Sequence, residues 1–357
     1  MKSSLLLFGL DTLECAYYLG RNLREGIDFD ALGAKKEALR AAKSRHSSPV
    51  KLGSEEFLLA SHGTGSGYPF LLENEAFSIQ CGPTNIPSFF VTYRSYALWQ
   101  YGAKQLHERF LNWAESIGYI PLRQESISRA DFAFDYLLSE LDFDEDSFVT
   151  KAAKDNQHRK HRKIQTFSFG EGHLRLRVYD KCAEIQEKSG KSWFFDLWGT
   201  DKDVWRIEWQ VRKDWLHRFG IRGLEDLFER QGDLLRALTN DHTTLRLKSQ
   251  DSNRSRWPLH PLWIDLQSRT NKLTGLGIYR ELDYEKLSEE RMLRIAISIY
   301  GYLKRIAAIE GLNQAQEKIT LSQAMSVLHH RLLNIHEPMS WHVDVERKMN
   351  EMRLSPW

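Results

Sequence analysis

The chain has 357 residues, of which 41% are hydrophobic and 27% are charged. This composition excludes a disordered chain and a fibrous protein, and the length allows two or three domains with a sizeable core. The 50 Lys and Arg nearly balance the 48 Asp and Glu, so the net charge is only +2. A surface that binds nucleic acid must therefore be a local patch.

Cysteine usage and hydropathy indicate the compartment. Cys15, Cys81 and Cys182 are too few and too scattered for a disulfide framework or a Cys-based zinc site. The apolar run 5–10 is too short for a signal peptide core, and the run 292–309 contains cations that a bilayer core would reject. We therefore expect a cytoplasmic protein with no membrane partner.

The first part of the chain predicts strands and two helices. Short β-type runs with Gly and Pro punctuation occur up to about residue 95. Frequent Ala, Lys, Glu and Leu predict a helix over 29–44. Apolar residues at helical spacing predict a second helix over 96–117, which ends at Gly118.

The middle of the chain predicts further strands, and the remainder predicts helices. The acidic segment 142–146 predicts the start of a helix that reaches about residue 153. Alternating apolar and polar residues predict strands at 127–137, 164–170, 173–181 and 204–212. Helical patterns follow at 224–238, 285–312, 320–335 and 341–353.

These elements predict an α+β fold with a central, mainly antiparallel sheet, helices on one face, and a helical C-terminal part. We expect an N-terminal α+β segment at 1–95, which could share the same sheet, and a catalytic core at 96–265. The helical region 266–357 would then recognise DNA or form a dimer.

Three of the predicted strands have a charged face. Residues two apart in a strand share a face, because side chains alternate across it. Ordinary strands of a sheet with one wet side also alternate, but short carboxylates beside arginines are unusual there. The charged faces hold Arg129, Asp131, Ala133 and Asp135 on the first strand, Arg175, Arg177, Tyr179 and Lys181 on the second, and Arg206, Glu208 and Gln210 on the third.

If these strands are neighbours, the residue types predict metal-dependent phosphoryl transfer. Clustered carboxylates repel one another unless a cation lies among them. Oxygen ligands favour a hard ion such as Mg²⁺ or Mn²⁺, which can polarise a phosphoryl oxygen. A tyrosine hydroxyl nearby can attack phosphorus and form a phosphotyrosine, which conserves the energy of the broken bond.

Three segments resemble the signature blocks of the replication initiation factor family. They are 128–136 (SRADFAFDY), 176–184 (LRVYDKCAE) and 205–213 (WRIEWQVRK). The family comprises Rep_trans rolling-circle plasmid initiators, filamentous-phage replication proteins and some relaxases. The order and approximate spacing of the blocks also match, over roughly residues 85–265, whereas the remaining segments match only in general character.

The resemblance implies a catalytic tyrosine. It makes Tyr179 the nucleophile, in an Arg, aliphatic, Tyr, Asp or Asn, Lys pattern, with Arg177 and Lys181 assisting at the phosphate. We expect the strand of Tyr179 to lie between the two strands that carry the acids. A phenol in the protein interior, or on the opposite side of the sheet from those acids, would end the case for DNA breakage.

The resemblance also implies a metal site. Asp131 and Glu208 would be ligands of Mg²⁺ or Mn²⁺, with Asp135 as a further candidate. Several family members have a second acid two residues after the position of Glu208, but this chain has Gln210. The number of ligands therefore stays open.

Several groups of cations are candidates for DNA contact. The run 151–163 has six cations against one acid, which fits contact with the DNA backbone and equally a solvated loop. Cations followed by Trp257 and Trp263 fit phosphate contact with base stacking, although tryptophans that anchor a loop are at least as common. The candidates are Arg129, Arg175, Arg206, Arg159, Lys160, Arg162, Lys163, Arg246, Lys248, Arg254 and Arg256.

The function that the resemblance implies is rolling-circle replication initiation. The protein would nick one strand at an origin and stay attached to its 5′ end through phosphotyrosine. The implied partners are double-stranded origin DNA with a single-stranded nick site and a host superfamily 1 helicase, and a homodimer is compatible. Two alternatives stay open: a conjugative relaxase of the same family acting at a transfer origin, and a non-catalytic origin-binding repressor.

Overall fold

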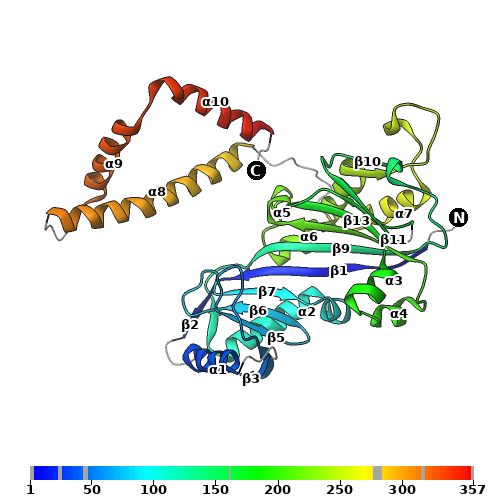
Figure 1. Ribbon diagram of the computed structural model, residues 1–357, viewed down its shortest axis with the longest axis horizontal. Helices are drawn as coiled ribbons and strands as arrows, with labels where there is room; N and C mark the ends of the chain where they lie inside the picture. Colours follow the sequence, from blue (N-terminus) through cyan, green and yellow to red (C-terminus); the bar gives the residue numbers. More distant parts are fainter. Residues whose placement is uncertain are drawn as a thin grey trace. The chain divides into compact units, whose positions relative to one another are not determined.

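A computed structural model describes residues 4–22, 26–42, 47–160, 162–275, 284–314 and 318–354 (Figure 1). The chain divides into two compact units, residues 1–279 and 280–357. In the part that the structure describes, no helix combines the length and the apolar character needed to cross a bilayer. The cysteines Cys15, Cys81 and Cys182 are free thiols, and all three are buried.

The first unit is built on an 11-stranded antiparallel sheet. The long strands β1 and β9 pair along most of their length near its centre. In spatial order the strands are β11 (Asp155–Lys160), β12 (Lys163–Phe169), β13 (Leu174–Asp180), β14 (Val204–Arg212), β9 (Ser126–Leu137), β1 (Ser4–Tyr17), β7 (Phe89–Tyr93), β6 (Phe77–Cys81), β5 (Phe70–Glu73), β4 (Glu55–Leu59) and β3 (Ser48–Leu52). Two small sheets pair β10 (Phe148–Thr150) with β15 (Thr243–Leu245), and β2 (Leu19–Arg21) with β8 (Tyr119–Pro121).

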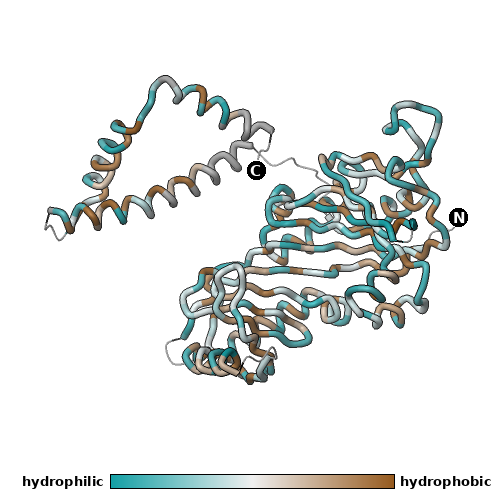
Figure 2. The backbone as a smooth tube through the Cα atoms, viewed as in Figure 1, coloured by the Kyte–Doolittle hydropathy of each residue, from teal (hydrophilic) through white to brown (hydrophobic). Residues whose placement is uncertain are grey.

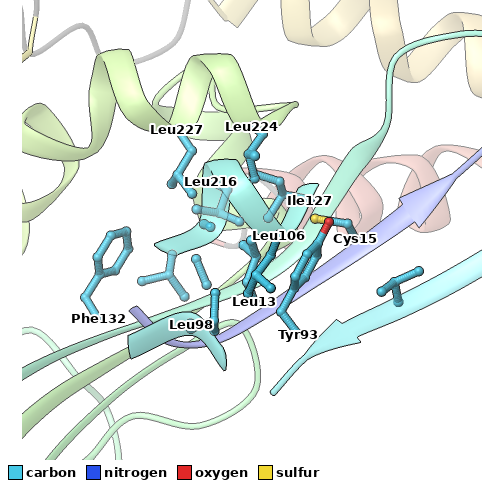
Figure 3. Packing of buried hydrophobic residues seen from close by; sticks show 14 of the residues in the cluster. Leu13, Cys15, Tyr93, Leu98, Leu106, Ile127, Phe132, Leu216, Leu224 and Leu227 are labelled. Carbon is cyan, nitrogen blue, oxygen red and sulfur yellow. The ribbon is translucent and has the colours of Figure 1, made fainter. Parts of the chain in front are cut away.

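Helices pack against this sheet and complete the main core. They are α2 (Ser95–Ser116), α5 (Lys213–Arg218), α6 (Leu224–Ala237) and α7 (Pro261–Thr270). The start of α7 follows from its sequence, because the His260 side chain accepts a hydrogen bond from Leu262 N and a proline occupies the first turn. Figure 3 shows how strands and helices share this core through Leu13, Cys15, Tyr93, Leu98, Leu106, Ile127, Phe132, Leu216, Leu224 and Leu227.

The helix α2 has two segments that face different surroundings. Gly102 has φ +77°, a conformation that favours glycine, and it kinks the helix. Before the kink, Trp99 packs on Gly9 of β1, where an added Cβ would lie 3.0 Å from the indole. After the kink, Leu106 and Phe110 are buried in the main core.

Two short helices cover part of the charged face of the sheet. They are α3 (Lys181–Glu184), which continues into a π-helical turn (Ile185–Ser189), and α4 (Trp193–Trp198). Figure 1 shows α3 and α4 on the opposite side of β1 and β9 from α5 and α6. Phe194, Trp198 and Cys182 form a second buried cluster with Ile185 and Val204. Aromatic side chains therefore cover part of the charged face, so it is not the wet side of an ordinary sheet.

The second unit contains α8 (Tyr284–Gln314), α9 (Leu321–Ile335) and α10 (Pro338–Leu354). Thr320 caps α9 in a reciprocal pair with Gln323, which explains where the helix begins. Figure 2 shows apolar and polar residues alternating along α8 and α9. The three predicted C-terminal helices are confirmed.

The α+β fold with an antiparallel sheet and a helical C-terminal part is confirmed, and α1 (Phe29–Ala41) matches the first predicted helix. The last two residues of that prediction, 43 and 44, lie outside the described residues. The strands before residue 95 join the same sheet as the predicted core, and α7 belongs to the first unit, since Trp263 and Leu266 are buried in its core. The helix predicted from 142–146 is wrong: a single 3₁₀ turn (Glu145–Ser147) leads into β10, which pairs with β15.

Candidate active site

The register of three adjacent strands brings the predicted site residues together. Strand β14 pairs with β13 on one side and with β9 on the other. Arg206 lies opposite Tyr179 and Asp135, and Glu208 lies opposite Arg177. The middle strand is therefore the one that carries Glu208, so the expectation that the strand of Tyr179 lies between the acids is wrong.

Tyr179 lies on the same side of the sheet as the acids. Its hydroxyl donates a hydrogen bond to Glu208 Oε2 at 2.8 Å. The residue is only 6% exposed. Burial, together with the charge of Glu208, raises the pKa of the Tyr179 phenol well above its usual value. The phenol thus shares the face of the acids, as expected, but it lies in the interior, which is the position stated above as counting against DNA breakage. Breakage therefore requires that the side chains over the phenol move away.

Long cationic side chains cover the phenol ring. The Arg177 guanidinium carbon lies 5.4 Å from the centre of the Tyr179 ring, and Lys181 Nζ lies 5.6 Å from it. Lys181 Nζ donates to Glu184 Oε2 at 2.5 Å, and burial lowers the pKa of Lys181. Arg177 is the more accessible cover, because its side chain is 36% exposed and that of Lys181 is 3% exposed.

Asp131 and Glu208 form an outer acidic pair under two arginines. Both carboxylate side chains are 2% exposed, while the Arg129 side chain over Asp131 is 22% exposed. Arg129 Nε donates to Asp131 Oδ1 at 2.8 Å, and Arg177 donates to Glu208 Oε1. Burial raises the pKa of Asp131 to about 6, against the hydrogen bond from Arg129, and the charge of Glu208 adds to the rise.

Asp135 and Arg206 form an inner ion pair that is fully buried. Arg206 Nε and Nη2 donate to the two Asp135 oxygens at 2.6 and 2.8 Å, and both side chains are 0% exposed. Trp198 Nε1 donates to Asp135 Oδ2 at 3.0 Å. The predictions of Asp135 as a metal ligand and of Arg206 as a DNA contact are therefore not supported, because each group is enclosed and satisfied by the other.

Asp11 on β1 belongs to this inner network, although the sequence reasoning missed it. Its Oδ1 accepts from Arg206 Nη1 at 2.8 Å and from Trp99 Nε1 at 3.0 Å. Although burial acts to raise it, the charges of Arg206 and Lys191 hold the pKa of the Asp11 carboxyl well below its usual range. The available signal was an aspartate that directly follows an apolar run predicted as a strand.

Two carboxylates are available for a divalent ion. Among the described residues, no group of three or more His, Cys, Asp and Glu is arranged to hold a metal. Gln210 lies opposite Asp131 in register, so it adds no third carboxylate beside the outer pair. Asp131 and Glu208 nevertheless fit Mg²⁺, which usually binds one or two protein carboxylates together with substrate phosphates and water.

A basic hairpin extends beyond the Tyr179 strand. Thr166 of β12 lies opposite Tyr179. Lys163 is three residues further along, which is about 10 Å at the usual rise per residue of a strand. The predicted DNA contacts of this hairpin line a groove that also includes Trp205; they are Arg159, Lys160, Arg162 and Lys163.

The other predicted DNA contacts occupy varied positions. Arg175 beside the outer acidic pair donates to the Gly170 carbonyl at 3.4 Å. In the connecting loop before α7, Lys248 and Arg254 pair with the acids of the 3₁₀ turn region, and Arg256 lies 4.0 Å from Asp251. Arg246 Nη1 donates to the Trp257 carbonyl at 2.6 Å, which holds the loop.

Trp257 in this loop and Trp263 in α7 have an anchoring role. Trp257 Nε1 donates to the Asp251 carbonyl at 2.6 Å, and Trp263 Nε1 donates to the Thr239 carbonyl at 2.8 Å. Trp263 is 0% exposed, so its ring is not available for base stacking. Of the two interpretations that the sequence left open, the structure favours anchoring.

Comparisons with known proteins give a similar solved structure. No family model matches the chain, and no curated protein matches it. Among solved structures, the chain is similar to the rolling circle replication initiator protein from Geobacillus stearothermophilus, with a TM-score of 0.47 and 18% identity over 76% of this chain and 98% of that chain. This level of similarity does not establish a family, so the family resemblance continues to rest on the three sequence blocks.

Proposed function

We propose that the protein is a rolling-circle replication initiator that nicks one DNA strand through Tyr179. The observation that carries the proposal is the 2.8 Å hydrogen bond from the Tyr179 hydroxyl to Glu208, on a face that also holds Asp131 and Arg177. A phenol that donates to a carboxylate beside a second carboxylate and an arginine suits attack on a phosphodiester.

The reaction would exchange one phosphodiester for another. Tyr179 Oη attacks the phosphorus, the bond from phosphorus to the 3′ oxygen breaks, and the 5′ phosphate becomes bonded to the tyrosine. Glu208 Oε2 is placed to take the phenol proton, since it already accepts that hydrogen bond. The released 3′ oxygen takes a proton and becomes a hydroxyl that a polymerase can extend. A second transfer by a free 3′ hydroxyl would reverse these bonds and close the displaced strand.

A divalent ion would be held by Asp131 and Glu208. When bound, Mg²⁺ or Mn²⁺ supplies positive charge to the phosphoryl oxygens and to the departing 3′ oxygen. Arg177 and Lys181 would bind the non-bridging oxygens, because both cations lie within 6 Å of the Tyr179 ring. The inner pair of Asp135 and Arg206 would hold the middle strand in register and touch no substrate.

The single-stranded nick site would approach along the basic hairpin. Its first cation, Lys163, lies three residues beyond the partner of Tyr179, which is about 10 Å along the strand. Origin DNA with a single-stranded nick site is therefore the proposed substrate. A host superfamily 1 helicase and a second copy of the chain are partners that the family resemblance implies, and the second unit is the proposed place for origin recognition or dimerisation.

Formation of a covalent adduct tests the proposal. The protein is incubated with Mn²⁺ and a supercoiled plasmid that carries its gene and the flanking DNA, and the products are separated under denaturing conditions. We expect an open circle with protein attached to a 5′ end, and none with Tyr179→Phe. Tyr136→Phe is a matched control, because Tyr136 is also buried and donates to a carboxylate, Asp265, but lies on the other face of the sheet.

One structural observation favours a second candidate function, that of a non-catalytic origin-binding repressor. The phenol is only 6% exposed, so cleavage requires Arg177 to move away. The same assay separates the two functions: a repressor would bind the plasmid and form no adduct in Mn²⁺. A relaxase would form the adduct at a transfer origin, so the position of the nick distinguishes it from an initiator.

A further inference from the structure

We propose that Arg177 acts as an internal counter-cation that keeps the site closed until a DNA phosphate draws its guanidinium away from Glu208. Binding of phosphate and binding of a divalent ion at the Asp131 and Glu208 pair would then favour each other. This inference rests on the proposed function, because it assumes a phosphodiester substrate. It goes further in naming the group that couples the two ligands.

The position of Arg177 is the first observation. Its Nη2 donates to Glu208 Oε1, while Glu208 Oε2 accepts from Tyr179. Its charge also interacts favourably with Asp131, and its guanidinium carbon lies 5.4 Å from the centre of the Tyr179 ring. One guanidinium thus neutralises the acidic pair that an ion would occupy and lies against the nucleophile. An ion and this guanidinium therefore compete for the same carboxylates.

The second observation is an unsatisfied donor on the same side chain. Arg177 Nε is buried and has no hydrogen-bond partner in the described part of the chain. A buried donor without an acceptor costs free energy, and a phosphate offers several charged acceptor oxygens. The guanidinium is therefore incompletely bound where it lies and has hydrogen bonds to gain from a phosphate.

The inner ion pair provides a comparison, because its arginine is fully enclosed and bound by acids. Arg206 uses Nε and Nη2 on Asp135 and Nη1 on Asp11, and its side chain is 0% exposed. Within the part of the chain that the structure describes, Arg177 makes a single side-chain hydrogen bond to an acid, and its side chain is 36% exposed. The partly exposed, singly bonded arginine can exchange its partner at a much smaller cost than the enclosed one.

Reciprocity follows from the competition. If a phosphate removes Arg177 from Glu208, the carboxylate pair gains net negative charge and binds a divalent ion more tightly. By linkage, the ion then raises the affinity for the phosphate by the same factor. The nucleophile loses the guanidinium that covers it in the same event, so the phenol is uncovered only when a phosphate is bound.

Metal binding without cleavage tests this inference. Mn²⁺ affinity is measured by calorimetry on Tyr179→Phe protein, alone and with a saturating single-stranded oligonucleotide. We compare Arg177→Gln with Arg175→Gln, which removes the same charge two residues away on the same strand face, where the hydrogen bond goes to the Gly170 carbonyl. Without DNA, Arg177→Gln should bind Mn²⁺ about tenfold more tightly than Arg175→Gln, or about 1.4 kcal/mol.

The second measurement is the effect of the oligonucleotide on Mn²⁺ affinity. The oligonucleotide should tighten Mn²⁺ binding about tenfold in Tyr179→Phe and in the Arg175→Gln variant, and leave the Arg177→Gln variant nearly unchanged. Equal Mn²⁺ affinities of the two glutamine variants, or an equal effect of the oligonucleotide on both, would overturn the inference. Arg177→Lys keeps the positive charge but lacks the guanidinium group, so its Mn²⁺ affinity should lie between those of Tyr179→Phe and the Arg177→Gln variant. Far-UV circular dichroism verifies that each variant is folded.

The two proposals fail in different ways. If wild-type protein forms the adduct but the two glutamine variants bind Mn²⁺ alike, the counter-cation role is wrong and nicking stands. If no adduct forms with any origin fragment while the oligonucleotide still changes Mn²⁺ affinity through Arg177, nicking is wrong and the coupling stands.

Discussion

Replacing Arg206 by methionine should destabilise the first unit by about 3–5 kcal/mol, because it leaves a buried carboxylate without its partner. Asp135 is 0% exposed and would keep the hydrogen bond from Trp198 as its remaining side-chain partner among those described here. Asp11 would lose the 2.8 Å bond from Nη1 but retain Trp99 and Lys191. The loss should therefore arise mainly at Asp135.

A surface pair with a similar N–O distance is the control. Arg40 Nη1 lies 2.7 Å from Glu37 Oε1, but these side chains are 48% and 66% exposed. Arg40→Met should cost less than about 1 kcal/mol, because exposed ion pairs are worth little in water. Both variants would be compared by urea denaturation at pH 7, followed by tryptophan fluorescence.

A double variant isolates the cause of the loss. Arg206→Met with Asp135→Leu removes both charges of the pair, so it should be more stable than Arg206→Met alone, since no unpaired charge remains at Asp135. The reasoning would be refuted if Arg206→Met cost no more than Arg40→Met. It would also be refuted if the double variant had a lower free energy of unfolding than Arg206→Met, because removing the unpaired carboxylate would then have given no gain.

Two further predictions concern pH and DNA affinity. Burial lowers the pKa of His242 to about 4 from 6.5, so the unfolded chain binds a proton that the folded chain rejects, and stability should fall by about 3 kcal/mol as the pH drops from 7 to 4. In His242→Gln the urea midpoint should therefore change less between pH 7 and pH 4 than in the wild type. An equal change of the midpoint in both proteins would contradict this prediction. Arg162 has φ +67°, so Arg162→Gly removes a hairpin cation without backbone strain. It should preserve stability, weaken DNA binding and reduce the salt slope by about 1, whereas an unchanged slope would place Arg162 away from the phosphates.

Local patterns in the sequence predicted the strands and faces of the candidate site. Alternation placed Asp131, Glu208 and Tyr179 on charged faces, and the structure puts all three on one side of the sheet. Alternation is a property of neighbouring residues in an extended chain, so the face of each side chain can be predicted without knowledge of the fold. Helical spacing predicted α2 and α6 for the same reason, since it depends on residues within two turns.

Contacts between distant parts of the chain could not be predicted in this way. The helix expected from 142–146 is replaced by β10 because its partner strand lies more than ninety residues later, where Thr150 and Thr243 share a hydrogen bond. The position of β14 between β13 and β9 is equally nonlocal, and it decides that Glu208 lies between Tyr179 and the strand of Asp131.

The pairing of charges depended most on the tertiary structure. The sequence identified acids and arginines on the same faces, but not that Asp11, 195 residues before Arg206, would help to enclose it. Nor did it indicate that α3, α4 and Trp99 would cover the face and leave Arg177 as the accessible cation over Tyr179. Burial turns a surface of mixed charge into specific ion pairs, because a charge removed from water requires a partner at hydrogen-bonding distance.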